Sequence, residues 1–480
     1  MSSEAVGARD AGGARRARRP RAAWRNGPLA SRDFRLLSAG QLTSTVGDFC
    51  YAVALPWLIL STHGGPILLG AVLACYGVPR TVLIPVGGIL ADKIGPRTVM
   101  LAADASRCVL VASLAVLAGR ATTSLALLGP VAALLGAGEG LFLPASFTIM
   151  PAILESDQLQ AGNALSSAMV QIGSLAGPVL GGLLVSTAGP APAFAVDAAS
   201  FAVSAVALAL IRARRLTGPS TQPDAEGGAD PADSSADATA RGGPALDATA
   251  ANPAEPATAG APPAGADANQ QAALNIWRFL RRSRLLQIML IVCVAANLTF
   301  GGTFAVALPA LAHARFGATG YGAMIACSGA GSVLGTLAAA RGTGLRRPAL
   351  VVCGVFLLEG LVVCFVPFLG GLAGAAAAIA VFGVCNGFGN IVVITLLQQW
   401  APSQLLGRVM SLVMLAAMGT FPASVAVSGV LVRHLGPSPF FPVAGIVLAV
   451  TMLGAITQRE FRDFGVASTA GPTGLTVDPA

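Results

Sequence analysis

The sequence predicts an all-α membrane protein in which twelve transmembrane helices form two six-helix bundles. Its mean hydropathy is +0.72, and charged residues make up 11% of the chain, whereas they make up roughly 25% of a soluble domain. Apolar stretches recur along the chain, each with the 18 or more residues that suffice to cross about 30 Å of hydrocarbon. These stretches form two sets of six with a polar segment between them.

The twelve apolar stretches define the expected spans and, with them, the domains. The first six lie near residues 34–61, 66–90, 98–118, 123–150, 163–186 and 190–211. The second six lie near residues 285–311, 320–340, 349–368, 372–398, 407–432 and 438–457. We therefore expect a basic N-terminal tail (1–33), a first bundle (34–216), a linker (217–273), a second bundle (274–460) and a C-terminal tail (461–480).

The positions of arginine and lysine predict the orientation. The N-terminal tail carries "ARRARRPRAAWR", and "DKIGPR", "RARR", "WRFLRRSR" and "RGTGLRR" fall in connections on the same side. Connections on the other side carry one basic residue at most. By the positive-inside rule, both termini and the linker are cytoplasmic. Only the connection between spans 4 and 5, with Glu155 and Asp157, departs from this pattern.

The net charge of +8 is interpreted as this topology signal rather than as a nucleic-acid-binding surface. Binding of RNA or anionic lipid by the arginine-rich tail is the alternative interpretation. The bias for arginine over lysine and the high alanine content suggest a bacterium with a GC-rich genome, so we expect a multi-pass protein of the bacterial cell membrane.

The remaining polar segments and the cysteines suggest no further chemistry. Residues 217–273 are rich in Ala, Pro, Gly and Asp, a composition that cannot bury enough apolar surface to fold, so we expect a disordered linker. The segment "LNIWRFLRRSRLLQ" after it fits a helix lying in the membrane interface. All eight cysteines fall in predicted spans without metal-ligand spacing. We expect free thiols, no metal site and no cofactor.

Two motifs recur at equivalent places in the two halves. "GGILADKIGPRTVML" follows span 2 and "LGTLAAARGTGLRRPAL" follows span 8, while "DQLQAGNALSS" precedes span 5 and "SQLLGRVMSLV" precedes span 11. Parallel six-span repeats of this kind predict a two-bundle transporter with its binding site at the bundle interface.

The segment "GGILADKIGPR" resembles the signature loop between spans 2 and 3 of the major facilitator superfamily. The resemblance implies the major facilitator fold, in which Asp92 acts as a conformational latch against the start of span 11, near Arg408. Pro96 departs from the pattern, and Ala339 stands where the second half would repeat Asp92. The expected latch network comprises Gly88, Asp92, Lys93, Gly95, Arg97, Asp104, Arg107 and Arg408, with Asp104 and Arg107 as a structural pair.

The segment "GSLAGPVLGG" in span 5 resembles the motif typical of exporters in this superfamily. The matching positions are Gly173, Gly177, Pro178, Gly181 and Gly182, with Ala164 at a leading position usually filled by glycine. Glycines at four-residue spacing let another helix approach closely. Generic helix packing is the alternative. More broadly, the chain resembles the branch of macrolide-efflux-like and enterobactin-exporter-like proteins, which contains drug:proton antiporters.

Polar residues inside the spans are the candidate cavity residues. Gln41, Ser44, Thr45 and Asp48 lie at helical offsets 0, 3, 4 and 7 and so share one face of span 1. The resemblance implies that spans 1, 4, 7 and 10 line a central cavity, on which Glu139, Asn297, Asn386 and Asn390 also fall. Arg80 in span 2 is expected to pair with Asp48 or with a substrate carboxylate.

Asp48 and Glu139 are the candidates for proton coupling, because an acidic side chain at membrane depth is costly and is therefore a functional candidate by default. The alternative for each is a structural hydrogen bond or ion pair. Asp197 and Glu359 are interpreted as structural, and His63, His313 and His434 fall near external span ends, where no proton shuttle is expected.

These observations predict a secondary active exporter of a bulky amphipathic small molecule, driven by proton antiport with rocking of the two bundles. A drug, macrolide, siderophore or other secondary metabolite would fit a cavity with few charges. No phosphate-binding loop is found, so ATP hydrolysis is not expected. A membrane enzyme would need His, Asp or Glu residues clustered at one membrane face, and because the sequence suggests no such cluster, enzyme activity is not expected either. A facilitator or importer, a polytopic membrane enzyme and a non-transporting sensor are the alternatives. We expect a monomer with no nucleic-acid partner.

Overall fold

The computed structural model describes residues 27–62, 64–119, 124–155, 157–211, 280–281, 283–341, 347–401 and 405–462. The predicted linker, residues 274–279 and 282 of the expected interfacial helix and most of both tails lie outside these residues. Every regular element within them is a helix, and twelve are long and apolar enough to span a membrane. The predicted fold class and the number of spans are therefore confirmed.

The first half contains six spanning helices, preceded by the short helix η1 (Pro28–Ala30). They are α2 (Arg32–Ser61), α3 (Gly65–Ile94), α4 (Pro96–Ala118), α5 (Leu125–Ile153), α6 (Leu159–Ala188) and α7 (Pro190–Leu210). Helix α3 continues beyond the predicted end at residue 90, so most of the latch motif is helical. Gly95, at φ 86°, then turns the chain, and Pro96 begins α4. Gly189 and Pro190 join α6 to α7 in the same way, because glycine tolerates positive φ and proline suits a first helical turn.

The second half also contributes six spans, three of which are made of consecutive elements. The seventh span joins α9 (Arg284–Gly302), the π-helical η3 (Thr303–Ala307) and α10 (Leu308–Arg315). The remaining elements are α11 (Gly317–Arg341), α12 (Pro348–Phe365), η4 (Val366–Phe368), α13 (Gly371–Trp400), α14 (Leu406–Gly419), α15 (Phe421–Leu435), α16 (Pro437–Thr457) and the short α17 (Arg459–Arg462).

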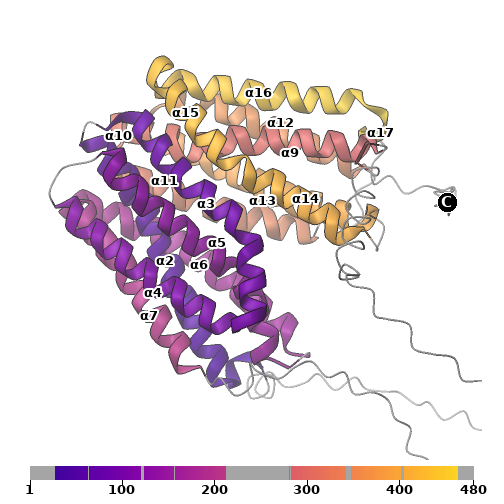
Figure 1. Ribbon diagram of the computed structural model, residues 1–480. Helices are drawn as coiled ribbons and strands as arrows, with labels where there is room; N and C mark the ends of the chain where they lie inside the picture. The colour runs from indigo at the N-terminus through magenta and orange to yellow at the C-terminus, as the bar shows by residue number, and fades with distance from the viewer. Residues whose placement is uncertain are drawn as a thin grey trace, which may run out of the picture.

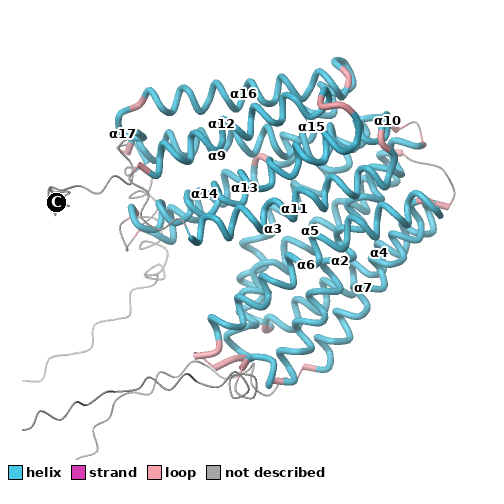
Figure 2. Tube along the Cα trace, turned by 180° about the vertical axis from the view of Figure 1, so that it is seen from behind, coloured by secondary structure: helices cyan, strands magenta, loops and turns pink. Residues whose placement is uncertain are grey.

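The two halves repeat one packing pattern. In the first half, α2 packs on α6 and α7, α3 packs on α5, and α4 packs on α7. The equivalent helices of the second half make the same contacts. There, α9 packs on α15 and α16, α11 packs on α13, and α12 packs on α16. The bundles meet through α6 against α11 and α3 against α15. In Figures 1 and 2 they diverge toward the side where α2 begins and α17 lies, here called the terminal side. The opposite side is the far side.

The buried apolar side chains form three clusters whose arrangement matches the divergence of the bundles. One cluster of buried side chains includes residues of both halves, and these lie in the far-side parts of the helices, as Ile59, Leu114, Ile379 and Phe441 illustrate. Two further clusters lie toward the terminal side, one entirely within the first bundle and one entirely within the second. The bundles therefore share a core on the far side and have separate cores on the terminal side.

Candidate functional site

A cavity of about 680 Å³, here called the central cavity, lies between the two bundles. Residues of α2, α3, α5 and α6 line one side of it, and residues of α9, η3, α11, α13 and α15 line the other. Much of its wall is aromatic, with Tyr51, Tyr76, Phe304, Tyr321 and Phe421 among the lining side chains. Such a wall suits an apolar or aromatic ring system, with few polar groups to fix its orientation.

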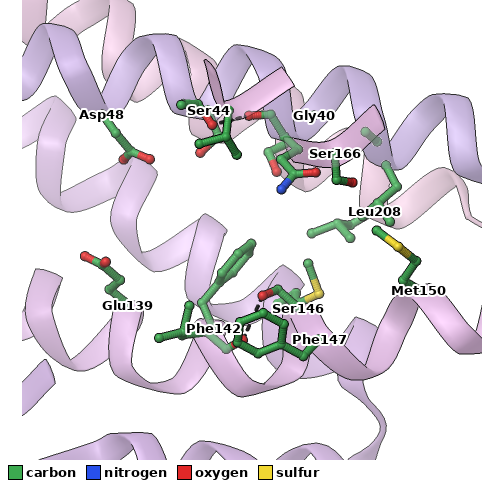
Figure 3. A pocket seen from close by; sticks show the side chains of 18 of the residues that line it. Gly40, Ser44, Asp48, Glu139, Phe142, Ser146, Phe147, Met150, Ser166 and Leu208 are labelled. Atoms are coloured by element: carbon green, nitrogen blue, oxygen red, sulfur yellow. Dashed lines mark hydrogen bonds between the residues drawn. The ribbon is translucent and has the colours of Figure 1, made fainter. Parts of the chain in front are cut away.

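A second cavity of about 610 Å³, here called the N-bundle cavity, lies within the first bundle toward the terminal side (Figure 3). Its lining residues come only from α2, α4, α5, α6 and α7. Many of its lining side chains carry a hydroxyl or a carboxamide group. These are Gln41, Ser44, Thr45, Ser146, Asn163, Ser166, Ser167, Gln171 and Ser204.

Glycines explain why the N-bundle cavity stays open between α2 and α5. A Cβ atom on Gly40 would lie 3.3 Å from the Cα atom of Ser204 on α7, so α2 sits close to α7. A Cβ atom on Gly140 would lie 2.5 Å from the carbonyl oxygen of Arg80, so α5 sits closer still to α3. Each helix is thereby held by a neighbour on its outer side.

The two cavities meet at Asp48 and Glu139, which line both, together with Val170 and Gln171. Figure 3 shows the two carboxylates pointing toward one another from facing helices. Glu139 Oε1 lies 3.0 Å from Arg80 Nη2, and both side chains are about one quarter exposed. Asp48 has no ion pair within 4 Å among the residues that the structure describes. Arg80 is thus paired with Glu139 and not with Asp48, one of the two partners expected for it; the other was a substrate carboxylate.

A second charge pair, Arg107 with Asp104, lies beside the N-bundle cavity, and its arginine lines the cavity. Arg107 Nη2 donates to Asp104 Oδ1 at 2.8 Å, and Ser204 Oγ donates to Asp104 Oδ2 at 2.6 Å. The Arg107 guanidinium lies between the rings of Phe142 and Phe201, 4.7 and 4.5 Å from their centroids. This stacked geometry is the one that favours arginine over lysine. The pair is nearly buried, so its charges offset one another inside the bundle.

The other cavity candidates divide into two groups. Gln41, Ser44 and Thr45 line the N-bundle cavity and Asn386 lines the central cavity. Arg80, Asn297 and Asn390 line neither of these two cavities. The amide of Asn297 donates instead to the carbonyl oxygen of Cys293 on its own helix, at 2.8 Å.

Sequence reasoning missed the polar face of α6. Asn163, Ser166, Ser167 and Gln171 recur at offsets 0, 3, 4 and 8, close to the pattern that singled out α2. The signal was present in "NALSSAMVQ". The glycine motif that follows in the same helix predicts close helix packing, and this interpretation leaves the polar face without a role.

The residues of the expected latch network lie at the terminal side. Asp92 and Lys93 are exposed at the end of α3, where the bundles diverge from one another (Figure 1). Arg97 donates from Nε to the carbonyl oxygen of Leu208 and from Nη2 to that of Ala209, both at 2.7 Å. Arg97 thus satisfies carbonyls at the end of α7. Arg408 begins the facing span of the second bundle.

The glycines of the span 5 motif pack on two neighbours. Cβ atoms built on Gly173, Gly177 and Gly181 would collide with α2, at Thr45, Phe49 and Cys50. Gly182 instead faces α11 of the second bundle, where a Cβ atom would lie 2.8 Å from the carbonyl oxygen of Ala318. A Cβ atom on Gly322 of α11 would in turn meet the carbonyl oxygen of Pro178. The motif therefore lets α6 approach both α2 and the opposite half.

The remaining chemistry-bearing side chains form no further centre. All eight cysteines are free thiols. No group of three or more His, Cys, Asp or Glu side chains that is suited to a metal ion occurs in the described part of the chain.

A sequence model of the Major Facilitator Superfamily matches residues 37–421. Multidrug efflux pump Tap of Mycolicibacterium fortuitum is 30% identical over 195 residues, which cover 39% of this chain and 46% of that protein. The putative multidrug resistance protein MdtD of Pectobacterium carotovorum subsp. carotovorum is 29% identical over 154 residues, 32% of each chain. The match thus spans less than half the length of these relatives.

Solved structures share the fold at low identity. A POT family transporter in complex with 5-aminolevulinic acid aligns with a TM-score of 0.63 at 14% identity, over 89% of this chain and 96% of that one. The nucleoside transporter NupG aligns with a TM-score of 0.64 at 13% identity, over 88% of this chain and 99% of that one. At these identities the likeness concerns the fold alone.

Proposed function

Because the chain belongs to the Major Facilitator Superfamily, we propose that it is a secondary active transporter that exports a bulky amphipathic small molecule in exchange for protons. The observation that carries the proposal is the position of Asp48 and Glu139. Both carboxylates lie in the wall shared by the two cavities, at the depth where the bundles meet. Ionisable groups at membrane depth that face a cavity are typical of proton and substrate pathways.

Asp48 and Glu139 have different roles in this proposal. Asp48, which has no described ion-pair partner, takes up a proton on one of its carboxylate oxygens when the site faces outside and releases it when the site faces the cytoplasm. Glu139 is held by Arg80 at 3.0 Å and positions this guanidinium beside the cavity. A substrate that bears a positive charge competes with the proton for Asp48, which couples the two movements.

The proposed alternating movement is based on the apolar core, which the two bundles share on the far side and not on the terminal side. With both termini in the cytoplasm, as the positive-inside rule predicts, the conformation with diverging terminal sides is open to the cytoplasm. Rocking of the bundles separates the shared far-side core and brings Asp92 toward the start of α14. There the latch stabilises the outward-facing state, because a carboxylate is favourable near a helix N-terminus.

The substrate class is inferred from the cavity walls and from the relatives. An aromatic wall and one unpaired carboxylate suit an amphipathic organic molecule. Multidrug efflux pump Tap and the putative multidrug resistance protein MdtD are similar over part of the chain, which supports drugs or other secondary metabolites as substrates and export as the direction.

The test uses everted membrane vesicles that are energised by respiration and contain a pH-sensitive dye. A panel of macrolides, lipophilic cations and siderophores is added to vesicles carrying the wild type, Asp48→Asn or the control Asp157→Asn, whose side chain is exposed outside the cavities. Proton efflux triggered by substrate in the wild type and the control, but not in Asp48→Asn, is expected. Equal efflux in all three would remove Asp48 from coupling. Substrate uptake without proton movement in the folded wild type would favour a facilitator.

A further inference from the structure

The N-bundle cavity contains an unusual group of polar side chains. Gln41, Ser44, Asn163, Ser166 and Ser167 line it, and none of these side chains makes a hydrogen bond to any residue that the structure describes. Nearby hydroxyl groups behave differently. Thr45 donates to the carbonyl oxygen of Gln41, and Ser146 donates to that of Leu143.

Ser166 is the most informative member of this group. The residue is 8% exposed, and its buried Oγ atom has no hydrogen-bond partner. A buried hydroxyl group without a partner costs free energy. Serine in a helix usually avoids this cost by bonding to a carbonyl one turn earlier. Ser166 does not, although it lines the cavity (Figure 3), so a ligand group in the cavity would supply the partner that its hydroxyl group lacks.

The charges around the cavity limit what that ligand can be. Arg107 is paired with Asp104, and Glu139 is paired with Arg80, so the wall beyond Asp48 is electrically balanced. A ligand group that carried its own charge would need an opposite charge there. Of the five polar side chains, Ser166 is buried, Gln41 and Ser44 are half-buried, and Asn163 and Ser167 are exposed. An apolar group would leave the buried Ser166 hydroxyl group unsatisfied and would displace water from the others that it covered. An uncharged group with several hydroxyl groups satisfies both conditions.

The geometry of donors and acceptors favours such a group further. Carboxamide side chains offer both donors and acceptors, and each serine hydroxyl group donates one hydrogen bond and can accept two. Hydroxyl groups of a sugar ring have the same dual character. Phe142 and Phe147 also line the cavity and offer aromatic faces to the apolar C–H face of a sugar (Figure 3).

We propose that the N-bundle cavity is a separate subsite that binds an uncharged, hydroxyl-rich substituent, namely a glycosyl group, of a substrate whose apolar ring system occupies the central cavity. The inference rests on the proposed function in one respect, namely that the molecule bound in the two cavities is the transported substrate. The subsite itself is defined by the residues of the first bundle. Asp48 and Glu139 lie at the point where the two parts of the ligand join.

The test measures binding rather than transport. The full-length protein in lipid nanodiscs is titrated with 4-methylumbelliferyl β-D-glucoside and with 7-methoxy-4-methylcoumarin, which shares the ring system and lacks the sugar. Ser166→Ala removes only a hydroxyl group that has no protein partner, so the fold should be retained. Ser186→Ala, on the same helix outside both cavities, is the matched control because its hydroxyl group bonds to Leu183. Asn163→Ala is a second variant at the subsite.

The wild type is expected to bind the glucoside at least about fivefold more tightly than the methoxycoumarin. Ser166→Ala and Asn163→Ala should each weaken glucoside binding by about 3- to 10-fold, the effect of one lost hydrogen bond, and leave methoxycoumarin binding unchanged. Ser186→Ala should change neither affinity. Equal wild-type affinities for the two probes, or an equal effect of Ser166→Ala on both, would overturn the subsite.

The binding experiment tests the subsite independently of the vesicle experiment, which tests proton-coupled export. Binding in nanodiscs needs no proton gradient. Glucoside-selective binding without substrate-triggered proton efflux would support the subsite and contradict proton-coupled export. Proton efflux together with unselective binding would support export and contradict the subsite.

Discussion

Gly182 of α6 and Gly322 of α11 bring the backbones of the two halves into contact on the far side. A Cβ atom on Gly182 would lie 3.3 Å from the Cα atom of Gly322, and one on Gly322 would lie 3.2 Å from the Cα atom of Gly182. Backbone atoms cannot move aside as a flexible side chain can. The contact therefore admits no larger residue while the far side stays closed.

We expect Gly182→Ala to disfavour this closed far side. The added methyl group would press on the carbonyl oxygen of Ala318, and overpacking of this kind costs about 1–3 kcal/mol. Thermal unfolding in detergent should show a lower midpoint than the wild type. Gly454→Ala is the control, because a Cβ atom there meets nothing within 4 Å. Equal midpoints for the two variants would contradict the close packing.

The Arg80–Glu139 pair predicts a rescue between two variants. Arg80→Gln leaves the Glu139 carboxylate without its cation, and the loss should lower the free energy of unfolding by about 1–3 kcal/mol. Adding Glu139→Gln should restore part of this loss, since no charge is then left alone. A double-mutant cycle from thermal unfolding measures the coupling. Additive effects of the two changes would show that the ion pair contributes nothing.

The proposed latch predicts a shift in conformation. Asp92→Asn removes a carboxylate that stabilises the outward-facing state, so the state open to the terminal side should be populated about 2- to 5-fold more, as expected for a helix-terminus interaction. Ser146→Cys, in a background without the native cysteines, reports this opening through its rate of reaction with a membrane-impermeant thiol reagent. Asp157→Asn changes an exposed carboxylate on the same side and is the control. Equal rates for the two variants would argue against the latch.

Glu359 of α12 is fully buried, and the hydrogen bond to its side chain predicts how substitutions there change stability. Asn386 Nδ2 donates to Glu359 Oε1 at 3.4 Å, while Oε2 has no partner among the described residues. Glu359→Gln keeps the acceptor and removes the possibility of a buried charge, so the unfolding midpoint should be unchanged or higher. Glu359→Ala leaves Asn386 without its partner and should cost about 1–3 kcal/mol. A lower midpoint for Glu359→Gln would show that the carboxyl group itself is needed.

Hydropathy alone predicted the twelve spans, because a segment that crosses about 30 Å of hydrocarbon needs roughly 20 predominantly apolar residues. The same signal placed the end of the second span at residue 90, four residues before α3 ends at Ile94, because the polar residues of the latch motif continue the helix beyond the apolar stretch. Periodicity also placed Gln41, Ser44, Thr45 and Asp48 on one face of α2, and all four line the N-bundle cavity.

The partners of these residues were beyond sequence reasoning. Which side chain reaches Arg80 depends on how closely α5 packs on α3, and that distance is set by Gly140 and other small residues far away in the chain. The division of the site into two cavities depends on the same contacts. A single sequence reports the character of each helix face but not which faces meet.

Asp48, which lines both cavities without an ion pair to any described residue, has a consequence for the energy source. Exchange of one proton for a substrate with one positive charge would move no net charge across the bilayer, so only the pH gradient would drive it. Exchange for an uncharged substrate would be electrogenic, and the membrane voltage would add about 2.3 kcal/mol per 100 mV. A cell that maintained voltage but little pH gradient would then clear neutral compounds and retain cationic ones.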